Sequence, residues 1–285
     1  MRALVRRPAS ELTGQGVEPV MGSLADRRSL DALVAGADAV IHLAGAINAA
    51  TPGDFAAANV AGTAMLADAA AATGAQPRFL LVSSLAARRP ELSAYARTKR
   101  EAEAELRRRA GRLDAVILRP PAIYGPSDRA TLPLFRQLAR GLILVPRNPA
   151  ARFSLLFADD LADLLTRLAA GTGGPAEPLE PDDGRPGGYG WHDLAAIAAR
   201  ALDRRVRTLG VPRSLLWGPA ALLEGAGRLL GRPPPLSRGK LAELYFPDWV
   251  CRPATAGALA GWAPRTTFET GCAVTVAWYR AQGWL

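Results

Sequence analysis

The stretch Phe79-Leu-Leu-Val-Ser-Ser-Leu-Ala-Ala-Arg-Arg-Pro-Glu-Leu-Ser-Ala-Tyr-Ala-Arg-Thr-Lys99 decides the fold that the rest of the chain must fit. It opens with an apolar run that ends in Ser84, which predicts a buried strand. Beyond a turn that contains proline, Tyr95 and Lys99 stand four positions apart, so on a helix their side chains share one face. A strand that leads directly into a helix is the unit from which parallel sheets are built.

The Tyr95–Lys99 pair is also a chemical signal. An ammonium beside a phenol favours the phenolate, so we expect Lys99 to lower the pKa of Tyr95 from its ordinary value near ~10. A phenol tuned in this way exchanges a proton with an alcohol or ketone oxygen near neutral pH. Lys99 and Lys240 are the only lysines in a chain with 35 lysines and arginines. Because an arginine fork does not replace a compact ammonium, this choice favours catalysis over the alternative of a solvated surface pair.

Composition narrows the function classes. The 285 residues suffice for one large or two modest domains, and the hydrophobic content of 49% is that of a globular protein. The net charge is +9, yet the arginines are scattered, with no basic tail and no interleaved aromatic residues, which argues against a nucleic-acid partner. Cys251 and Cys272 form neither a disulfide framework nor a metal-ligand spacing. With no signal peptide and no long uncharged apolar run, we expect a cytoplasmic protein.

Short apolar runs alternate with Ala-rich helical patterns, which predicts an α/β fold with a parallel sheet. The expected strands are Arg2–Val5, Glu18–Met21, Ala39–Leu43, Phe79–Ser83, Ala115–Leu118 and Phe153–Phe157. The expected helices are Ser29–Ala35, Asp54–Ala72, Ser93–Arg109, Leu132–Ala139, Asp159–Ala170, Trp191–Leu202, Pro212–Leu230, Ser237–Leu244 and Thr267–Ala281. The breaker cluster at 171–175 places a domain boundary between residues 1–170 and a smaller, mostly helical domain of residues 171–285.

Three expected strands end in residues suited to a ligand site, and the carboxyl ends of parallel strands carry the chemistry in such folds. The run His42-Leu-Ala-Gly45 ends one of them in small residues, which permit a flat ligand to approach the backbone. Ser84 ends the next, where its hydroxyl is expected to face the Tyr95 phenol. The run Arg119–Pro126 follows the third with a rigid turn.

Together these pieces resemble the extended short-chain dehydrogenase/reductase family, also called the NAD-dependent epimerase/dehydratase family. The resemblance covers residues 1 to about 170 and rests on the order and spacing of eight runs, namely Leu4-Val-Arg-Arg-Pro8, Gly22-Ser-Leu-Ala-Asp26, His42-Leu-Ala-Gly45, Asn59-Val-Ala-Gly-Thr63, Val82-Ser-Ser84, Tyr95-x-x-x-Lys99, Leu118-Arg-Pro-Pro-Ala-Ile-Tyr-Gly-Pro126 and Phe153-Ser-Leu-Leu-Phe-Ala-Asp-Asp160.

The resemblance implies a role for each matching residue. Tyr95 would be the catalytic acid/base, Lys99 would hold the nicotinamide ribose and tune Tyr95, and Ser84 would orient the substrate carbonyl. The cofactor cleft would be lined by Ser23, Leu24, Leu43, Ala44, Gly45 and Val82, with Pro120, Ala122 and Ile123 near the nicotinamide.

One part of the family pattern is not found in this sequence. The family begins with a strand and a Gly-rich turn that receives the pyrophosphate, whereas Arg2–Val5 matches the family's second strand. We therefore expect a Rossmann-type doubly wound sheet that lacks its first βα unit. Because that strand is central, two strands about 9–10 Å apart would have no ladder between them. A start codon further upstream and a true truncation both stay open as explanations.

The residues that follow the strand Arg2–Val5 predict which cofactor is bound. In the family an acidic residue there bonds the ribose 2′-hydroxyl, and here Arg6 and Arg7 stand in its place. Arginine suits a 2′-phosphate, so NADP is expected over NAD.

Two groups of polar residues are given no catalytic role. His42 is interpreted as a packed residue at a strand end. Asp159 and Asp160 resemble paired catalytic carboxylates, but a helix N-terminus explains them better, because Asp favours caps and first turns.

The residue at one sequence position narrows the choice of substrate class. Relatives that act on nucleotide sugars usually carry Asn where this chain has Ala122, and those acting on sterols and related ketones tend to have a small residue there. The leading hypothesis is an NAD(P)H-dependent ketone reductase or alcohol dehydrogenase with an apolar or lipid-like small-molecule substrate, a description that 3-keto sphingolipid reductases fit. The alternatives are a nucleotide-sugar epimerase or dehydratase, and a non-catalytic NADPH-binding subunit like the 39-kDa subunit of respiratory complex I.

The segment 212–230 has leucines at near-helical spacing and two arginines. It is interpreted either as a core helix of the second domain or as an apolar lid or membrane-surface helix that presents a lipid-like substrate. A homodimer is left open.

Overall fold

The computed structural model describes residues 1–173, 175, 177–252 and 262–285, so residue 174 of the expected breaker cluster lies outside it. The strands are β1 Arg2–Val5, β2 Glu18–Met21, β3 Ala39–His42, β4 Arg78–Val82, β5 Asp114–Leu118, β6 Ala122–Tyr124, β7 Leu142–Pro146, β8 Arg152–Phe153, β9 Leu155–Phe157, β10 Arg207–Val211 and β11 Asp248–Trp249. The α-helices are α1 Ser10–Thr13, α2 Arg27–Val34, α3 Pro52–Phe55, α4 Gly62–Ala72, α5 Ala94–Arg107, α6 Leu132–Ala139, α7 Ala158–Ala170, α8 Trp191–Leu202, α9 Arg213–Leu230, α10 Arg238–Tyr245 and α11 Phe268–Ala281. A π-helix, η1 (Ala56–Ala61), and a 3₁₀-helix, η2 (Leu85–Arg88), complete the set.

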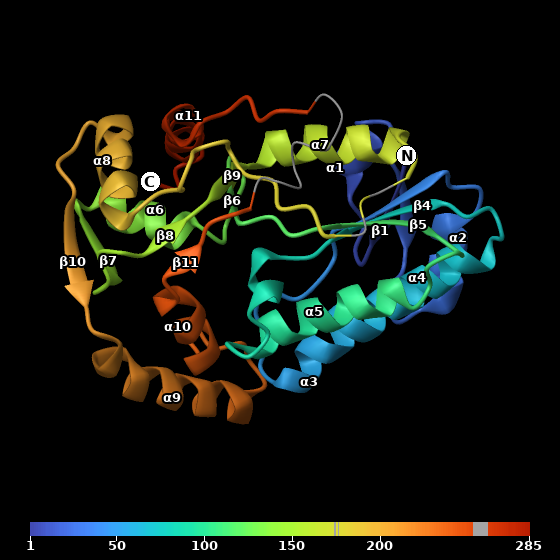
Figure 1. Cartoon of the computed structure of the whole chain (residues 1–285), viewed down its shortest axis with the longest axis horizontal. Coiled ribbons are helices and arrows are strands. Elements are labelled where there is room, and N and C mark those ends of the chain that lie inside the picture. Colours follow the sequence, from blue (N-terminus) through green and yellow to red (C-terminus); the bar gives the residue numbers. More distant parts are fainter. Residues whose placement is uncertain (174, 176, 253–261) are drawn as a thin grey trace.

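The central sheet has the parallel order β3–β4–β5. Figure 1 labels two of its strands, β4 and β5. Helices cover both faces of the sheet, so β4 is buried over its whole length. Phe79 and Leu81 pack among residues of α2, α4 and α5, whereas Leu80 and Val82 pack against α7. This two-sided burial explains why the strand is an uninterrupted apolar run. The expected doubly wound α/β architecture is confirmed.

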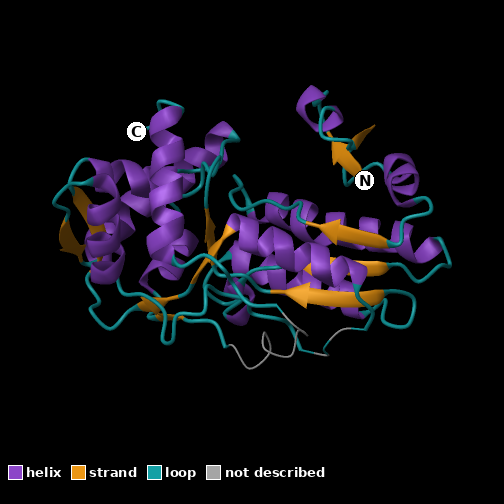
Figure 2. Ribbon diagram, turned by 90° about the horizontal axis from the view of Figure 1, so that it is seen from above, coloured by secondary structure: helices purple, strands orange, loops and turns teal. Residues whose placement is uncertain are grey.

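The first two strands form a separate parallel pair, with Arg2 opposite Glu18 and Val5 opposite Met21. Among the described residues, β1 has no strand partner besides β2, and β3 has none besides β4. Figure 2 shows the pair near the N-terminus, set apart from the three strands of the central sheet. The expected break in the ladder between the strands at 2–5 and 39–43 is therefore present.

The half of the molecule that contains α6, α8 and α11 packs around a core of its own. That core combines residues of β7, α6 and β9 with residues of α8 and α11, and includes the fully buried rings of Tyr189 and Tyr279. Since β10 also pairs with β7, and β11 with β8, elements on both sides of residue 170 contribute to this half of the molecule. The division at residue 170 stays a prediction.

Most predicted elements are present with ends shifted by one or two residues, but the strands of the second half were underpredicted. The expected strand 153–157 is divided into β8 and β9, which pair with β11 and β6. Four strands were not expected, β6, β7, β10 and β11, and the last two lie in the part predicted as mostly helical. These are short runs, of five residues or fewer, whose pairing partners lie far away in the sequence.

The helical stretch 52–72 is the one in the described part of the chain that is long and apolar enough to cross a bilayer by length and composition. It consists of α3, η1 and α4 in succession. Leu66, Ala67 and Ala70 of α4 are buried against the central sheet. We therefore interpret the stretch as a core helix.

Candidate functional site

Ser84 and Tyr95 lie together at the carboxyl end of β4. Ser84 begins η2, and its Oγ accepts a hydrogen bond from the Ala86 amide at 3.2 Å. Ser93 caps α5 by accepting from the Ala96 amide at 2.9 Å, which places Tyr95 in the first turn of that helix. The Ser84 side chain lies close enough to the Tyr95 phenol to act on its pKa. The structure thus brings the two hydroxyls together as expected.

The expected direction of the Tyr95 pKa shift is wrong. Burial of the phenol raises the pKa of Tyr95 to about 12, and the Glu243 carboxylate adds to this rise, whereas the hydrogen bond with Ser84 opposes it. Lys99 is not among the groups that shift the pKa of Tyr95, and its ammonium donates a hydrogen bond to the Val82 carbonyl at 3.0 Å. The phenol is therefore protonated at neutral pH in this structure.

Lys99 is a buried cation with few partners. Its side chain is 7% exposed, and the loss of solvation lowers its pKa to about 8, against an opposing attraction from Glu103. At neutral pH the ammonium keeps its charge, next to the carboxyl end of β4. A buried charge of this kind, close to the Ser84–Tyr95 pair, is typical of functional sites.

The wall after β3 is formed by Leu43, Ala44 and Gly45, which are all exposed. A Cβ added at Gly45 would lie 2.8 Å from Asn59 Oδ1 and 3.4 Å from Lys99 Nζ, so a larger residue would press on both. The exposed backbone beside a buried ammonium fits the nicotinamide ribose that the family would place here.

Asn59 holds this wall in place, a role that the sequence did not reveal. Its side chain is buried in η1, accepts a hydrogen bond from the Ala46 amide at 2.7 Å and donates to the Ala46 carbonyl at 3.1 Å. It also donates to Thr98 Oγ1 at 3.0 Å, which ties the wall to α5. A π-helical turn at such a position is typical of functional sites. Asn59 stood in one of the matching runs, but nothing in its spacing predicted a π-helix.

Glu103 was also missed. It is fully buried and accepts two hydrogen bonds from the Arg119 guanidinium, at 2.7 and 2.6 Å, and one from Ser83 Oγ at 2.8 Å. This bidentate pair joins α5 to the ends of β4 and β5. A glutamate among many charged helix residues carries no sequence signal of burial.

His42 is packed, as expected. It is 2% exposed, its Nε2 lies 2.9 Å from Thr63 Oγ1, and burial together with the Lys99 charge lowers its pKa to about 4. The imidazole is therefore neutral and satisfied.

The residues after β5 border the same end of the sheet. The Pro120 carbonyl accepts a hydrogen bond from the Leu85 amide at 2.9 Å, which holds this segment beside the start of η2. Ala122 is exposed and Ile123 half-buried on β6. With Val82, they complete the side of the site opposite the β3 wall, since β4 runs between β3 and β5.

The residues expected at the far end of the cofactor are carried by the β1–β2 pair. Arg6 and Arg7 follow β1, are exposed, and make no hydrogen bond or ion pair with any other described residue. Ser23 Oγ accepts from the Ala25 amide at 3.3 Å, and the Leu24 side chain packs on Gly62 of α4. The adenosine half of the expected cleft is thus not joined to the central sheet by a strand ladder.

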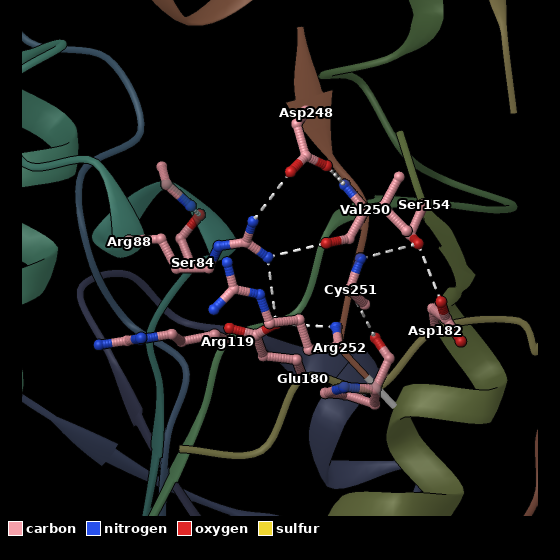
Figure 3. Close-up of polar contacts among 12 residues, drawn as sticks. Ser84, Arg88, Arg119, Ser154, Glu180, Asp182, Asp248, Val250, Cys251 and Arg252 are labelled. Atoms are coloured by element: carbon pink, nitrogen blue, oxygen red, sulfur yellow. Dashed lines mark hydrogen bonds and ion pairs between the residues drawn. The ribbon is translucent and has the colours of Figure 1, made fainter. Parts of the chain in front are cut away.

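An ion-pair network attaches the second half of the chain next to Ser84 (Figure 3). Arg88, in η2, donates to Glu180 at 3.2 Å and to the Val250 carbonyl at 2.7 Å. Glu180 also accepts from the Arg252 amide at 3.0 Å. Arg88 and Glu180 are largely buried, so this network holds the segment after β11 against the end of β4.

Asp159 and Asp160 occupy the first turn of α7, as expected of helix-terminal residues. Asp160 is buried and accepts from the Thr266 amide at 2.9 Å and the Arg265 amide at 3.2 Å. It therefore fastens the segment before α11 onto α7.

Comparison with known proteins identifies the family. A model of the NAD dependent epimerase/dehydratase family matches residues 2–177. The chain belongs to this family. The resemblance of the eight sequence runs is thereby confirmed, and family membership supports an NAD-dependent oxidoreductase, although the roles of individual residues stay predictions.

Two curated relatives carry reductase names. The ceramide reductase of Caulobacter vibrioides is 39% identical over 270 residues, which span 94% of this chain and 82% of that protein. A 4-hydroxy-2-methyl-3-oxo-4-farnesyl-3,4-dihydroquinoline-1-oxide ketoreductase of Stigmatella aurantiaca is 34% identical over 153 residues, which span 47% of this chain and 46% of the relative.

Among solved structures, MoeE5 bound to UDP-glucose and NAD superposes with a TM-score of 0.72. The match covers 99% of this chain and 90% of MoeE5 at 17% identity, so it shows the shared fold alone.

Proposed function

We propose that this protein reduces an apolar, lipid-like ketone to an alcohol with NADPH as the preferred reductant. The observation that carries the proposal is that the Ser84 and Tyr95 side chains lie next to each other at the carboxyl end of β4, with the buried Lys99 one helical turn further along. Two hydroxyls that converge on one point suit a carbonyl oxygen, because one can donate a proton while the other holds the oxygen in place.

The chain's residues perform the proton transfer. Tyr95 donates its phenolic proton to the ketone oxygen while Ser84 holds that oxygen by a hydrogen bond. A bound reduced nicotinamide would supply the hydride for the carbonyl carbon, so that hydride and proton together would convert the ketone into an alcohol. The pKa of Tyr95, raised to about 12, keeps the phenol in the protonated form that reduction consumes.

The residues present suit the nicotinamide half of the cofactor. Lys99 and Tyr95 would hold the ribose, the wall 43–45 would lie along it, and Pro120, Ala122 and Ile123 would border the ring. Arg6 and Arg7 would meet the adenosine 2′-phosphate, which favours NADPH over NADH.

The substrate class rests on Ala122 and on the relatives. Ala122 offers no polar side chain for a nucleotide, which argues against the nucleotide-sugar alternative. The relative with 39% identity over most of both chains is named a ceramide reductase, so a 3-keto ceramide is the substrate to test first.

The test is a Tyr95→Phe variant assayed with NADPH and a 3-keto ceramide. Loss of the proton donor should lower kcat/KM by about 10²–10⁴-fold, whereas the Kd for NADPH should rise by about tenfold at most, since one hydrogen bond to the ribose is lost and Lys99 remains. Tyr245→Phe is the matched control, because its hydroxyl bonds the Val211 carbonyl outside the site. Unchanged turnover in Tyr95→Phe would refute the acid role, and epimerisation of UDP-glucose by the wild type would favour the nucleotide-sugar alternative.

A further inference from the structure

Helix α9 turns its apolar side outward. Leu215, Leu222 and Leu229 follow one another at intervals of seven residues, two helical turns, and are 65%, 77% and 90% exposed. The two buried residues of this helix are the small Ala220 and Gly227. A helix that packs a core does the reverse, so the core-helix interpretation of 212–230 is wrong.

The leucine face covers more than one line of residues. Leu223 and Leu230 stand one position beyond Leu222 and Leu229, and are 39% and 71% exposed. The apolar stripe therefore follows the whole helix, which lies along the lower edge of the molecule in Figure 1, opposite α7 and α11. A contiguous apolar stripe of this length marks an interaction surface.

The charges around the stripe are positive. Between residues 212 and 240 there are four arginines and one lysine but one glutamate, Glu224. Glu224 is engaged by Arg228 at 2.6 Å and by Arg238 at 3.2 Å. Leucines bordered by exposed arginines match a surface with an apolar interior and anionic headgroups.

The stripe is connected to the Ser84–Tyr95 site. Glu224 accepts from Arg238 at the start of α10, and Glu243 of the same helix accepts from the Ser93 hydroxyl that begins α5. The turn between α9 and α10 meets the segment after β3, where Asn48 Nδ2 donates to the Pro234 carbonyl at 3.3 Å. Neighbouring Ile47 is 64% exposed. The segment that follows the wall of the site thus contacts the turn at the end of α9 and carries an exposed apolar residue.

We propose that the leucine face of α9 docks the protein on an anionic lipid bilayer. The leucines enter the interface between headgroups and acyl chains, and the arginines at both ends of the helix bind the headgroups. Docking then brings a lipid-like ketone to the Ser84–Tyr95 pair without passage through water. Only this delivery of substrate rests on the proposed function.

The test is co-sedimentation of the 285-residue protein with vesicles of phosphatidylcholine, with and without about one third phosphatidylglycerol. We expect binding to the anionic vesicles, weakened at about 1 M salt, where charges are screened beyond roughly 3 Å. Leu222→Glu/Leu229→Glu should reduce the bound fraction by about tenfold or more, since two leucines lose their burial. Val274→Glu is the matched control, because Val274 is 45% exposed on α11 at the far side of the molecule.

Three outcomes overturn the proposal. They are failure of the wild type to bind anionic vesicles, equal loss of binding in Val274→Glu, and equal binding of the double leucine variant and the wild type. If the wild type binds no vesicles but forms a dimer that the double leucine variant dissociates, the leucine face binds a second copy of the chain instead. Vesicle binding is measured without substrate or NADPH, so it stands or falls separately from reductase activity. Turnover of a short, water-soluble ketone should be the same in the double leucine variant as in the wild type.

Discussion

The β3–β4–β5 sheet and the β1–β2 pair are both parallel, yet they differ in support. Helices cover the central sheet on both faces, and β4 is buried from end to end, whereas each residue of β1 is half-buried and β2 is half-buried or exposed. The residues proposed to transfer the proton belong to the first region, and the expected adenosine-binding residues belong to the second. The difference teaches that the two halves of one ligand cleft need not be equally stabilised.

The largest expected effect concerns the buried charge that braces the central region. Glu103→Ala leaves Arg119 unpaired in the core, so the free energy of unfolding should fall by about 3–5 kcal/mol in chemical denaturation. Glu101→Ala, on the same helix but 49% exposed, should cost less than about 0.5 kcal/mol. Equal losses in the two variants would mean that the pair at Glu103 is not a structural brace.

A direct comparison of the two regions replaces one leucine in each. Leu80→Ala, in the middle of β4 and fully buried, should lower the free energy of unfolding by about 2–5 kcal/mol. Leu4→Ala in β1, where the side chain is half-buried, should cost about half as much or less. If denaturation curves show equal losses, the β1–β2 pair is as tightly integrated as the central sheet, and the comparison fails.

The pH dependence of kcat/KM should show which of the two groups, Lys99 or Tyr95, limits ketone reduction at high pH. Because the pKa of Lys99 is about 8 and that of Tyr95 about 12, the rise in pH removes the ammonium charge first. The kcat/KM for ketone reduction should therefore fall about tenfold per pH unit above pH 8. Lys240→Met is the control, since it removes the other lysine, 65% exposed, and should leave the profile unchanged. A profile that is flat to pH 10 would contradict this assignment.

The lowered pKa of Lys99 has the opposite effect on stability: activity should fall as the pH rises, whereas the free energy of unfolding should increase. The pKa of Lys99 lies below its unfolded value of about 10.4, so between about pH 8 and 10 the unfolded chain binds more protons. This group alone should make the free energy of unfolding rise with pH in that window. Denaturation of wild type and Lys99→Met at both ends of the window measures the contribution, which the variant should lack.

The smallest expected effect lies in the β1–β2 region. Arg6→Ala/Arg7→Ala should reduce the preference for NADPH over NADH by about fivefold, because exposed ion pairs contribute up to about 1 kcal/mol. Arg28→Ala, exposed on the neighbouring α2, should leave the preference unchanged. Steady-state kinetics with NADPH and with NADH measure this preference. A wild type that prefers NADH would contradict the assignment of Arg6 and Arg7 to the 2′-phosphate.

Much of the central region was predictable because its signals are local. The strand at 79–82 and the helix that carries Tyr95 and Lys99 follow from apolar runs and helical spacing. The convergence of Ser84 with Tyr95 followed from the rule that parallel strands present their carboxyl ends at one edge. By contrast, the hydrogen-bond partners of Asn59 and Glu103 lie up to 39 residues away in the chain, and no local sequence pattern predicts them.

By itself the sequence determined the family and the order of the βα units, and it predicted which side chains react, since these depend on residue type and short spacing. Only the tertiary structure decided that the phenol of Tyr95 is made less acidic, that Lys99 turns to the Val82 carbonyl, and that α9 presents its leucines outward. Each of these depends on burial and on which distant groups come into contact, and burial is a property of the folded chain as a whole.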